Sequence, residues 1–269
     1  MKKTVFLCLL LVMALSLSGC VTLRFYEGEP LVQVPNGLQA TPGVTDATDL
    51  QSDPSNAANW SKEEIVARFC DAVNLSKGNT LNYTLQKGVK HEVTFLGTAD
   101  GQMPRMAESV VKKLNRNESH SYTVTGGTAV TETGNISATE LIAPKGMQFA
   151  LQDAQITAAQ ASFDGTNVIA VISLCDDTAN AQQPIPAIHG ELISYLSFRG
   201  QDLSPYSVQT AQLEYTDVSL AASIDSAGRL VTMSITANVT GSGVGAFTVL
   251  TTEALFTAKV KESYAFSYS

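Results

Sequence analysis

The C-terminal half of the chain alternates apolar and other residues over four stretches, and this pattern limits the possible folds most. Apolar side chains recur at every second position along 218–224, 231–239, 254–260 and 264–268. The turn-forming sequence Asp225–Gly228 joins the first two stretches. Period-two alternation with short turns is typical of antiparallel strands that bury one face. We therefore predict an α+β fold, in which an antiparallel sheet carries a few helices on one face. A half-open barrel is one form that such a sheet can take.

Shorter elements are expected before residue 218. Alternation and turn-forming residues predict strands at 81–85, 91–95, 121–131 (a hairpin broken at Gly126-Gly127), 156–163 and 168–175. Apolar residues at helical spacing predict helices over 106–114 and 185–198.

The clearest helix start lies at Ser61. Ser61 followed by Glu64 forms a capping-box pattern, in which each side chain accepts a hydrogen bond from the other residue's backbone N–H. Trp60 and Ile65 flank this box at the positions of a hydrophobic staple, and Gly78 is placed to end the helix. These features predict local structure, and they place the start of the folded domain at Trp60.

The N-terminus has the layout of an export signal. Lys2 and Lys3 precede an apolar run over 5–17, which is shorter than the ~20 residues of a membrane-spanning helix. The run ends in Leu17-Ser18-Gly19-Cys20, which resembles the lipobox of bacterial lipoproteins. That resemblance implies cleavage before Cys20 and a diacylglyceryl thioether with palmitate-type acyl chains on its sulfur. The protein would then be anchored by lipid on the extracytoplasmic face of the cell membrane.

Three regions follow from these signals. Residues 1–19 form the predicted lipoprotein signal peptide, 20–59 a disordered polar tether, and 60–269 a single α+β domain. The tether is predicted from breakers such as Pro35-Asn36-Gly37 and Pro42-Gly43, with little apolar periodicity between them.

The charge balance excludes one class of partner. Without the signal segment, the chain has 15 Lys and Arg residues against 25 Asp and Glu residues, a net charge of −10. Nucleic-acid binding needs clustered cations, so this composition argues against it. Attachment to an anionic membrane would depend on the lipid rather than on charge.

A second resemblance starts at the predicted helix. The sequence Trp60-Ser61-Lys62-Glu63-Glu64-Ile65-Val66, with Ala72-Val73-Asn74 and Lys77, resembles the start of the domain in clostridial-type extracellular lipoproteins. In that group a lipobox and a polar tether precede a tryptophan, a capped helix and a β-rich domain. The group has no assigned activity, so the resemblance implies a layout. The long hairpins also resemble, in layout, the half-open barrels of lipid carriers, and fold alone does not give function.

Two cysteines remain in the predicted domain, because Cys8 lies in the signal and Cys20 carries the lipid. Outside the cytoplasm Cys70 and Cys175 can form a disulfide, or they can both be buried free thiols. The sequence leaves both alternatives open.

Two short motifs match known site patterns. Gly241–Ala246 fits G-x-G-x-x-A, but a dinucleotide site needs a following helix, and 247–250 is β-rich. We therefore expect a flexible loop there. Ser109–Lys112 fits S-x-x-K without the companion motifs of penicillin-recognising enzymes, so we expect an exposed helix face.

Metal and cofactor sites are not predicted. His91, His120 and His189 are isolated in the sequence, and the adjacent carboxylates Asp176 and Asp177 are expected to face water. We therefore expect no metal, no cofactor and no catalytic residues.

The sequence favours a non-catalytic binding module at the cell envelope, with an envelope protein, a wall polymer or a lipid as its ligand. One alternative is a carrier that encloses a lipid between apolar sheet faces. Another is an envelope hydrolase, for which Ser109 and Lys112 are the only candidate pair. A carrier needs a large apolar cavity, and a hydrolase needs a polar cleft with a base beside its nucleophile.

Overall fold

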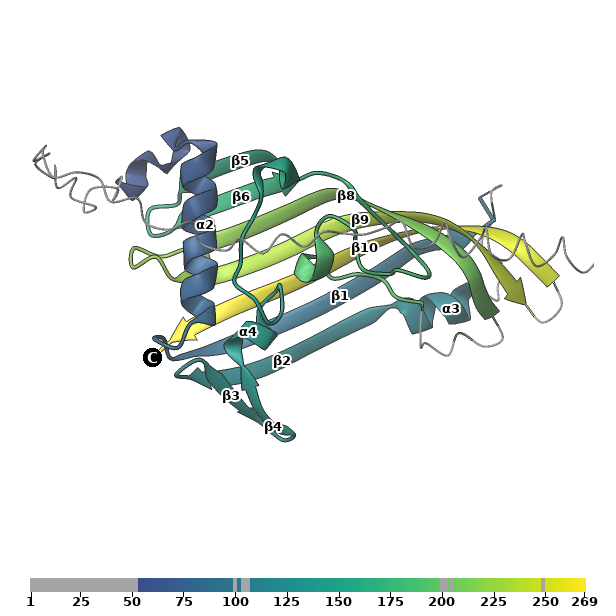
Figure 1. Ribbon diagram of the computed structural model, residues 1–269, viewed down its shortest axis with the longest axis horizontal. Coiled ribbons are helices and arrows are strands. Elements are labelled where there is room, and N and C mark those ends of the chain that lie inside the picture. Colours follow the sequence, from purple (N-terminus) through teal and green to yellow (C-terminus); the bar gives the residue numbers. More distant parts are fainter. Residues whose placement is uncertain (1–52, 99–100, 103–106, 199–202, 204–205, 248–249) are drawn as a thin grey trace, which may run out of the picture. The chain divides into compact units, whose positions relative to one another are not determined.

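One open antiparallel sheet of ten strands organises the computed structural model, which describes residues 53–98, 101–102, 107–198, 203, 206–247 and 250–269 (Figure 1). The strands lie in the order β4-β3-β2-β1-β10-β9-β8-β6-β5, and β7 also pairs with β8. The predicted α+β class with an antiparallel sheet is confirmed, and the sheet does not close into a barrel.

Side chains alternate between two faces along most of each strand, and β-bulges interrupt the alternation in β1, β5 and β8. The strands are β1 (Tyr83–Gly97), β2 (Arg116–Thr125), β3 (Thr128–Thr131), β4 (Gly134–Ser137), β5 (Ile156–Phe163), β6 (Val168–Leu174), β7 (Asp177–Asn180), β8 (Tyr206–Ile224), β9 (Leu230–Phe247) and β10 (Leu250–Tyr268). On β9, Met233, Ile235 and Val239 are each 1% exposed, whereas Thr232 and Thr240, which flank this run, are exposed. We call the buried side the inner face and the opposite side the outer face.

Short helices and loops cover the inner face. The helical segments are η1 (Pro54–Asn59), α2 (Lys62–Lys77), α3 (Ala107–Leu114), α4 (Ala138–Leu141), η2 (Asp153–Gln155) and η3 (Gly190–Leu192). In the described part of the chain, every helix is too short or too polar to cross a membrane.

The predicted capped helix is α2, which lies across the strands rather than along them (Figure 1). The Ser61 hydroxyl accepts a hydrogen bond from the backbone N–H of Glu64 at 3.2 Å, and Gly78 follows the last residue. Ile65, Phe69 and Val73 bury the same side of the helix, which contacts β5, β6, β8 and β9.

The folded unit begins earlier than Trp60. Residues 54–59 form η1, which contacts β5 and buries Ala57 completely. The Asp53 carboxylate accepts the backbone N–H of Ser55 at 2.9 Å and caps this turn. The tether prediction is therefore wrong for 53–59, and its remainder lies outside the described residues, as does the signal segment.

Two further expectations need correction. The segments 81–85 and 91–95 belong to the single strand β1, because β2 and β10 pair with it on both sides along 83–91. The helix expected over 185–198 is absent apart from η3. Gly190 has a positive φ of 56°, which interrupts an α-helix.

The outer face carries mainly small polar residues. On β9 these are Thr232, Ser234 and Thr236, and they pair with Ser223, Ala221 and Ser219 of β8.

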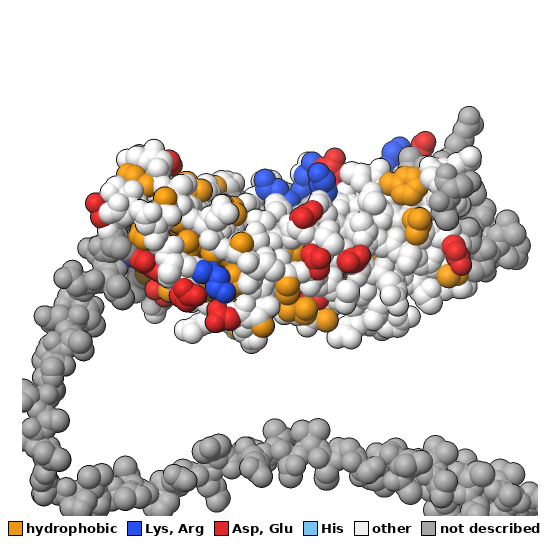
Figure 2. Space-filling model, turned by 90° about the horizontal axis from the view of Figure 1, so that it is seen from above, with side chains coloured by type: hydrophobic (Ala, Val, Ile, Leu, Met, Phe, Trp, Pro, Cys, Tyr) orange, Lys and Arg blue, Asp and Glu red, His pale blue; other side chains and the backbone are white. Residues whose placement is uncertain are grey.

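Figure 2 shows the molecule from above, with exposed hydrophobic side chains in small separate groups among polar and charged ones.

Candidate functional site

A cleft of about 780 Å³ lies on the inner face, above the middle of β1 and β2. Its walls come from the end of α3, from the segment 140–145 and from the segment 191–197. Ligand pockets usually measure ~300–1,000 Å³, so this cleft is of ligand size. Its charged or ionisable lining residues are Lys87, His91, Lys113, Arg116, Glu118, His120, Tyr122, Glu140, Lys145, Glu191, Tyr195 and Glu262.

The strand register places several of these groups on the floor of the cleft. Along β1, Lys87 and His91 follow Leu85 at alternate positions, so they point to the inner face where apolar residues would continue the pattern. His91 pairs with Arg116 of β2, and Val89 pairs with Glu118 of β2 on one side and with Glu262 of β10 on the other. The apolar alternation is thus replaced by charge in one zone of the sheet.

Lys87 and Glu262 form a buried ion pair. The Lys87 Nζ atom lies 2.6 Å from Glu262 Oε1, and the two side chains are 11% and 9% exposed. The same ammonium donates a hydrogen bond to the carbonyl of Leu141 at 2.7 Å and lies over the ring of Tyr264. Because both charges are buried and partnered, the pair holds the cleft floor against the wall that follows α4.

A second lysine and a tyrosine fix the same wall. Lys77 of α2 donates to the carbonyls of Ile142 and Pro144, and the Tyr264 hydroxyl accepts the backbone N–H of Ala143. Burial lowers the pKa of Lys77 to about 8, against the opposing effect of nearby Glu140. Burial also raises the pKa of Tyr264 well above its usual value.

His91 faces a serine on the opposite wall. Its Nε2 atom lies 2.7 Å from the hydroxyl oxygen of Ser194. His91 is 8% exposed, and burial, together with the Arg116 charge, lowers its pKa to about 4 despite nearby Glu262 and Glu118. The imidazole is therefore neutral at pH 7.

A charged row continues along β2. The Arg116 guanidinium contacts both carboxylate oxygens of Glu118 at 2.6 Å, in a bidentate arrangement. Glu118 also lies 3.6 Å from His120 Nε2. The hydrogen bonds from Arg116 lower the pKa of Glu118 and raise that of Arg116.

The lining is balanced in charge. Four cations, Lys87, Lys113, Arg116 and Lys145, stand with four carboxylates, those of Glu118, Glu140, Glu191 and Glu262. With His91 neutral, the cleft presents both signs of charge within one space of ligand size. Such a lining suits a ligand that itself carries both charges.

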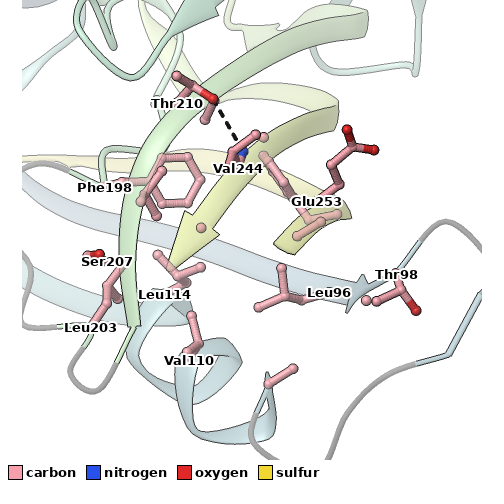
Figure 3. Close-up of a pocket in the computed structure, with 18 residues that line it drawn as sticks. Leu96, Thr98, Val110, Leu114, Phe198, Leu203, Ser207, Thr210, Val244 and Glu253 are labelled. Carbon is pink, nitrogen blue, oxygen red and sulfur yellow. Dashed lines mark hydrogen bonds between the residues drawn. The ribbon is translucent and has the colours of Figure 1, made fainter. Parts of the chain in front are cut away.

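A separate apolar cavity lies at the far end of the sheet, between α3 and the ends of β8, β9 and β10 (Figure 3). Its volume is about 90 Å³, and Val110, Leu114, Phe198 and Leu203 are among its lining residues. This is well below the volume of a usual ligand pocket. The apolar faces of 218–224, 231–239 and 254–266 lie instead mainly in the packed core.

The glycine-rich stretch 241–246 lies within β9 and pairs with β8 and β10 on both sides. The expectation of a flexible loop there is therefore wrong, and the next described element after β9 is the strand β10. A Cβ at Gly241 would overlap the Phe256 ring, and one at Gly243 would overlap the Thr210 carbonyl oxygen. These glycines allow the neighbouring strands to approach closely.

The remaining sequence candidates are dispersed. Ser109 and Lys112 lie on the exposed side of α3, as expected for a solvated helix face. Cys70 in α2 and Cys175 after β6 are both free, half-buried thiols, and burial raises the pKa of Cys70. The structure thus shows the free-thiol alternative. Cys20 lies outside the described residues.

Asp177 differs from the expectation that both adjacent carboxylates face water. Asp176 is exposed, but Asp177 is 2% exposed and accepts the backbone N–H groups of Thr178, Ile188 and His189. His189 Nε2 donates to the Cys175 carbonyl at 2.8 Å. These contacts stabilise the irregular segment where a helix was expected, because side chains take up its backbone N–H groups.

Sequence reasoning missed the cleft, although it named two of its histidines as isolated residues. The structure brings His91 and His120 together over one cleft and keeps His189 apart from it. The available signal was the position of Lys87, His91 and Glu262 at points where alternation demands an apolar side chain. Within the described ranges, no group of three or more His, Cys, Asp and Glu side chains could hold a metal ion.

Comparison of the chain with known protein families, with curated protein sequences and with solved structures found no match.

Proposed function

We propose that this protein is a lipid-anchored binding protein on the extracytoplasmic face of the cell membrane, and that its inner-face cleft binds a short zwitterionic peptide. The observation that supports the ligand class is the cleft of about 780 Å³ itself, in which the exposed Lys145 and Glu191 offer both signs of charge outside the ion pairs Lys87–Glu262 and Arg116–Glu118. A short peptide offers an ammonium end, a carboxylate end and amide groups between them. Its charges can therefore meet partners of opposite sign, while polar side chains pair with its amides.

The cleft is held open by a rigid frame, which also supports a binding role. Buried contacts from Lys77, Lys87 and Tyr264 fix the wall at 141–144, so binding would require little ordering of that wall. Lys145 and Glu191 are exposed on the cleft walls, where they can meet the two ends of a ligand.

Titration calorimetry with tri-alanine tests the ligand class. We expect tri-alanine to bind and its N-acetylated, C-amidated form to bind at least tenfold more weakly, because capping removes both charges. Lys145→Ala and Glu191→Gln should each weaken binding about tenfold, which corresponds to ~1.4 kcal/mol. Lys90→Ala, which removes an exposed outer-face cation, is the matched control and should leave affinity unchanged. Equal affinity for the capped and free peptides, or no binding of either, would reject the proposal.

The anchor is tested separately. Leu17-Ser18-Gly19-Cys20 supports lipidation of Cys20, so Cys20→Ala should abolish incorporation of labelled fatty acid and release the protein from the membrane fraction. Continued labelling of the variant would contradict this part of the proposal.

A further inference from the structure

We propose that Ser194 is a nucleophile that accepts the acyl group of a short-chain ester, with His91 as its general base. The proposal rests on the proposed function only in requiring that the inner-face cleft admit small ligands. It goes beyond binding, because it assigns covalent chemistry to two residues that the sequence did not connect.

Ser194 and His91 lie in direct contact across the cleft. The Ser194 hydroxyl oxygen and His91 Nε2 are 2.7 Å apart, which is the contact that a nucleophile and its base require. Both residues line the cleft, and Ser194 is half-buried rather than enclosed. Ser194 lies on the wall at 191–197 and His91 on the floor, so a ligand that enters between them meets the hydroxyl beside its base.

The surroundings of His91 set its protonation state. The charged groups near His91 are Arg116 and Glu118 from β2 and Glu262 from β10, while Lys113 and Glu191 line the same cleft from α3 and the facing loop. Burial and Arg116 lower the pKa of His91 to about 4, so its imidazole is free to accept a proton at pH 7. A base of such low pKa activates a hydroxyl weakly, so we expect acylation to be detectable and turnover to be slow.

The small apolar cavity near the cleft indicates the size of the acyl group. Leu114 of α3 lines both the cleft and the apolar cavity, so the two spaces adjoin. The segment that carries Ser194 reaches that cavity at Phe198 (Figure 3). The Phe198 ring packs edge-on against Phe256. With a volume of about 90 Å³, the cavity can hold a short acyl chain and excludes a long one. The polar cleft would face the alcohol part of the ester.

The reaction balances without a cofactor. The Ser194 oxygen forms a bond to the carbonyl carbon, its proton passes to His91 Nε2, and the bond from that carbon to the ester oxygen breaks. The leaving alkoxide takes the proton from His91 and departs as an alcohol. Water then attacks the acyl-serine, His91 takes a proton from the water, and the proton returns to the Ser194 oxygen as the carboxylic acid leaves.

The competing explanation is that the hydrogen bond between Ser194 and His91 only holds the segment 191–197 in place. A second contact already holds that segment in place, because the backbone N–H of Leu196 donates a hydrogen bond to the buried Tyr215 hydroxyl. A purely structural hydrogen bond would change stability when removed, but it would not make Ser194 reactive or link its reactivity to His91.

The test is labelling of the mature chain with a fluorophosphonate probe, followed by peptide mass spectrometry to locate the modified residue. We expect modification at Ser194, none in Ser194→Ala, and a rate at least tenfold lower in His91→Gln. Ser109→Ala, on the exposed side of α3, is the control and should label like the wild type. Thermal melting by circular dichroism checks that each variant is folded under the labelling conditions.

Two further readouts separate chemistry from structure. The labelling rate should be constant above about pH 5 and fall below it as His91 becomes protonated, and p-nitrophenyl butyrate should acylate the protein faster than p-nitrophenyl decanoate. No modification of Ser194 in the folded protein, or an unchanged rate in His91→Gln, would overturn the proposal. Tri-alanine binding without labelling removes this proposal alone, whereas labelling without tri-alanine binding removes the proposed ligand alone.

Discussion

At the scale of single residues, removing one member of the buried ion pair Lys87–Glu262 should strongly destabilise the folded protein. Glu262→Ala leaves the Lys87 ammonium buried beside the Leu141 carbonyl without its counter-charge. We expect the free energy of unfolding to fall by about 3–5 kcal/mol, measured by urea denaturation.

The control for this prediction is the exposed pair of Lys90 and Glu92, whose charged atoms lie 2.7 Å apart while the side chains are 53% and 50% exposed. Glu92→Ala should lower the free energy of unfolding far less, because solvent screens the pair. Similar losses for the two variants would show that burial of Lys87 and Glu262 has no energetic consequence.

His91 gives the second prediction at this scale. Its pKa is about 4 in the folded protein and 6.5 as a free side chain, so the unfolded chain binds more protons between these values. The contribution of His91 to the free energy of unfolding is therefore fully present above pH 6.5. It is lost as the pH falls towards 4, and the loss reaches about 3 kcal/mol. Urea denaturation at several pH values should show this loss relative to His91→Gln. Parallel pH profiles for the wild type and the variant would contradict the shifted pKa.

At the scale of elements, the glycines of β9 set how closely β8 can approach. In Gly243→Ala the new methyl group would overlap the Thr210 carbonyl oxygen, and we expect a loss of about 1–3 kcal/mol in the free energy of unfolding. At Gly245 the nearest atom is the Ser207 carbonyl oxygen at 3.4 Å, an ordinary contact. Gly245→Ala should therefore be neutral or stabilise by up to about 1 kcal/mol. Equal losses for the two variants would show that strand approach is not the cause.

Elements could be predicted wherever the hydrophobic pattern alone selects them. The alternation around Asp225–Gly228 and the cap at Ser61 are local signals, and the β8–β9 hairpin and α2 follow them. The segment 185–198 shows the limit of this reasoning. Its apolar spacing suits a helix, but two of its backbone N–H groups donate hydrogen bonds to Asp177 of β7 and Tyr215 of β8. Such partners are fixed by tertiary structure.

At the scale of the whole molecule, the sheet could be predicted and the candidate site could not. A sheet with one buried face follows from alternation, because each strand must hide its apolar side. The cleft depends on which charged residues face each other once β2, β1 and β10 are aligned, and on two loops that the sequence does not position. Only Lys87, His91 and Glu262 could have indicated it, since each interrupts an inward apolar series.

The central claim is that the inner-face cleft is the ligand-binding site of this protein. Hydrogen–deuterium exchange of the mature chain tests this claim most directly. Exchange is measured without tri-alanine and with tri-alanine at a concentration that stabilises the protein. The cleft account predicts slower exchange in the walls at 140–145 and 191–197, and no change in α2 or in the β5–β6 hairpin. Protection confined to those control elements, or no protection at any tri-alanine concentration, would contradict the claim.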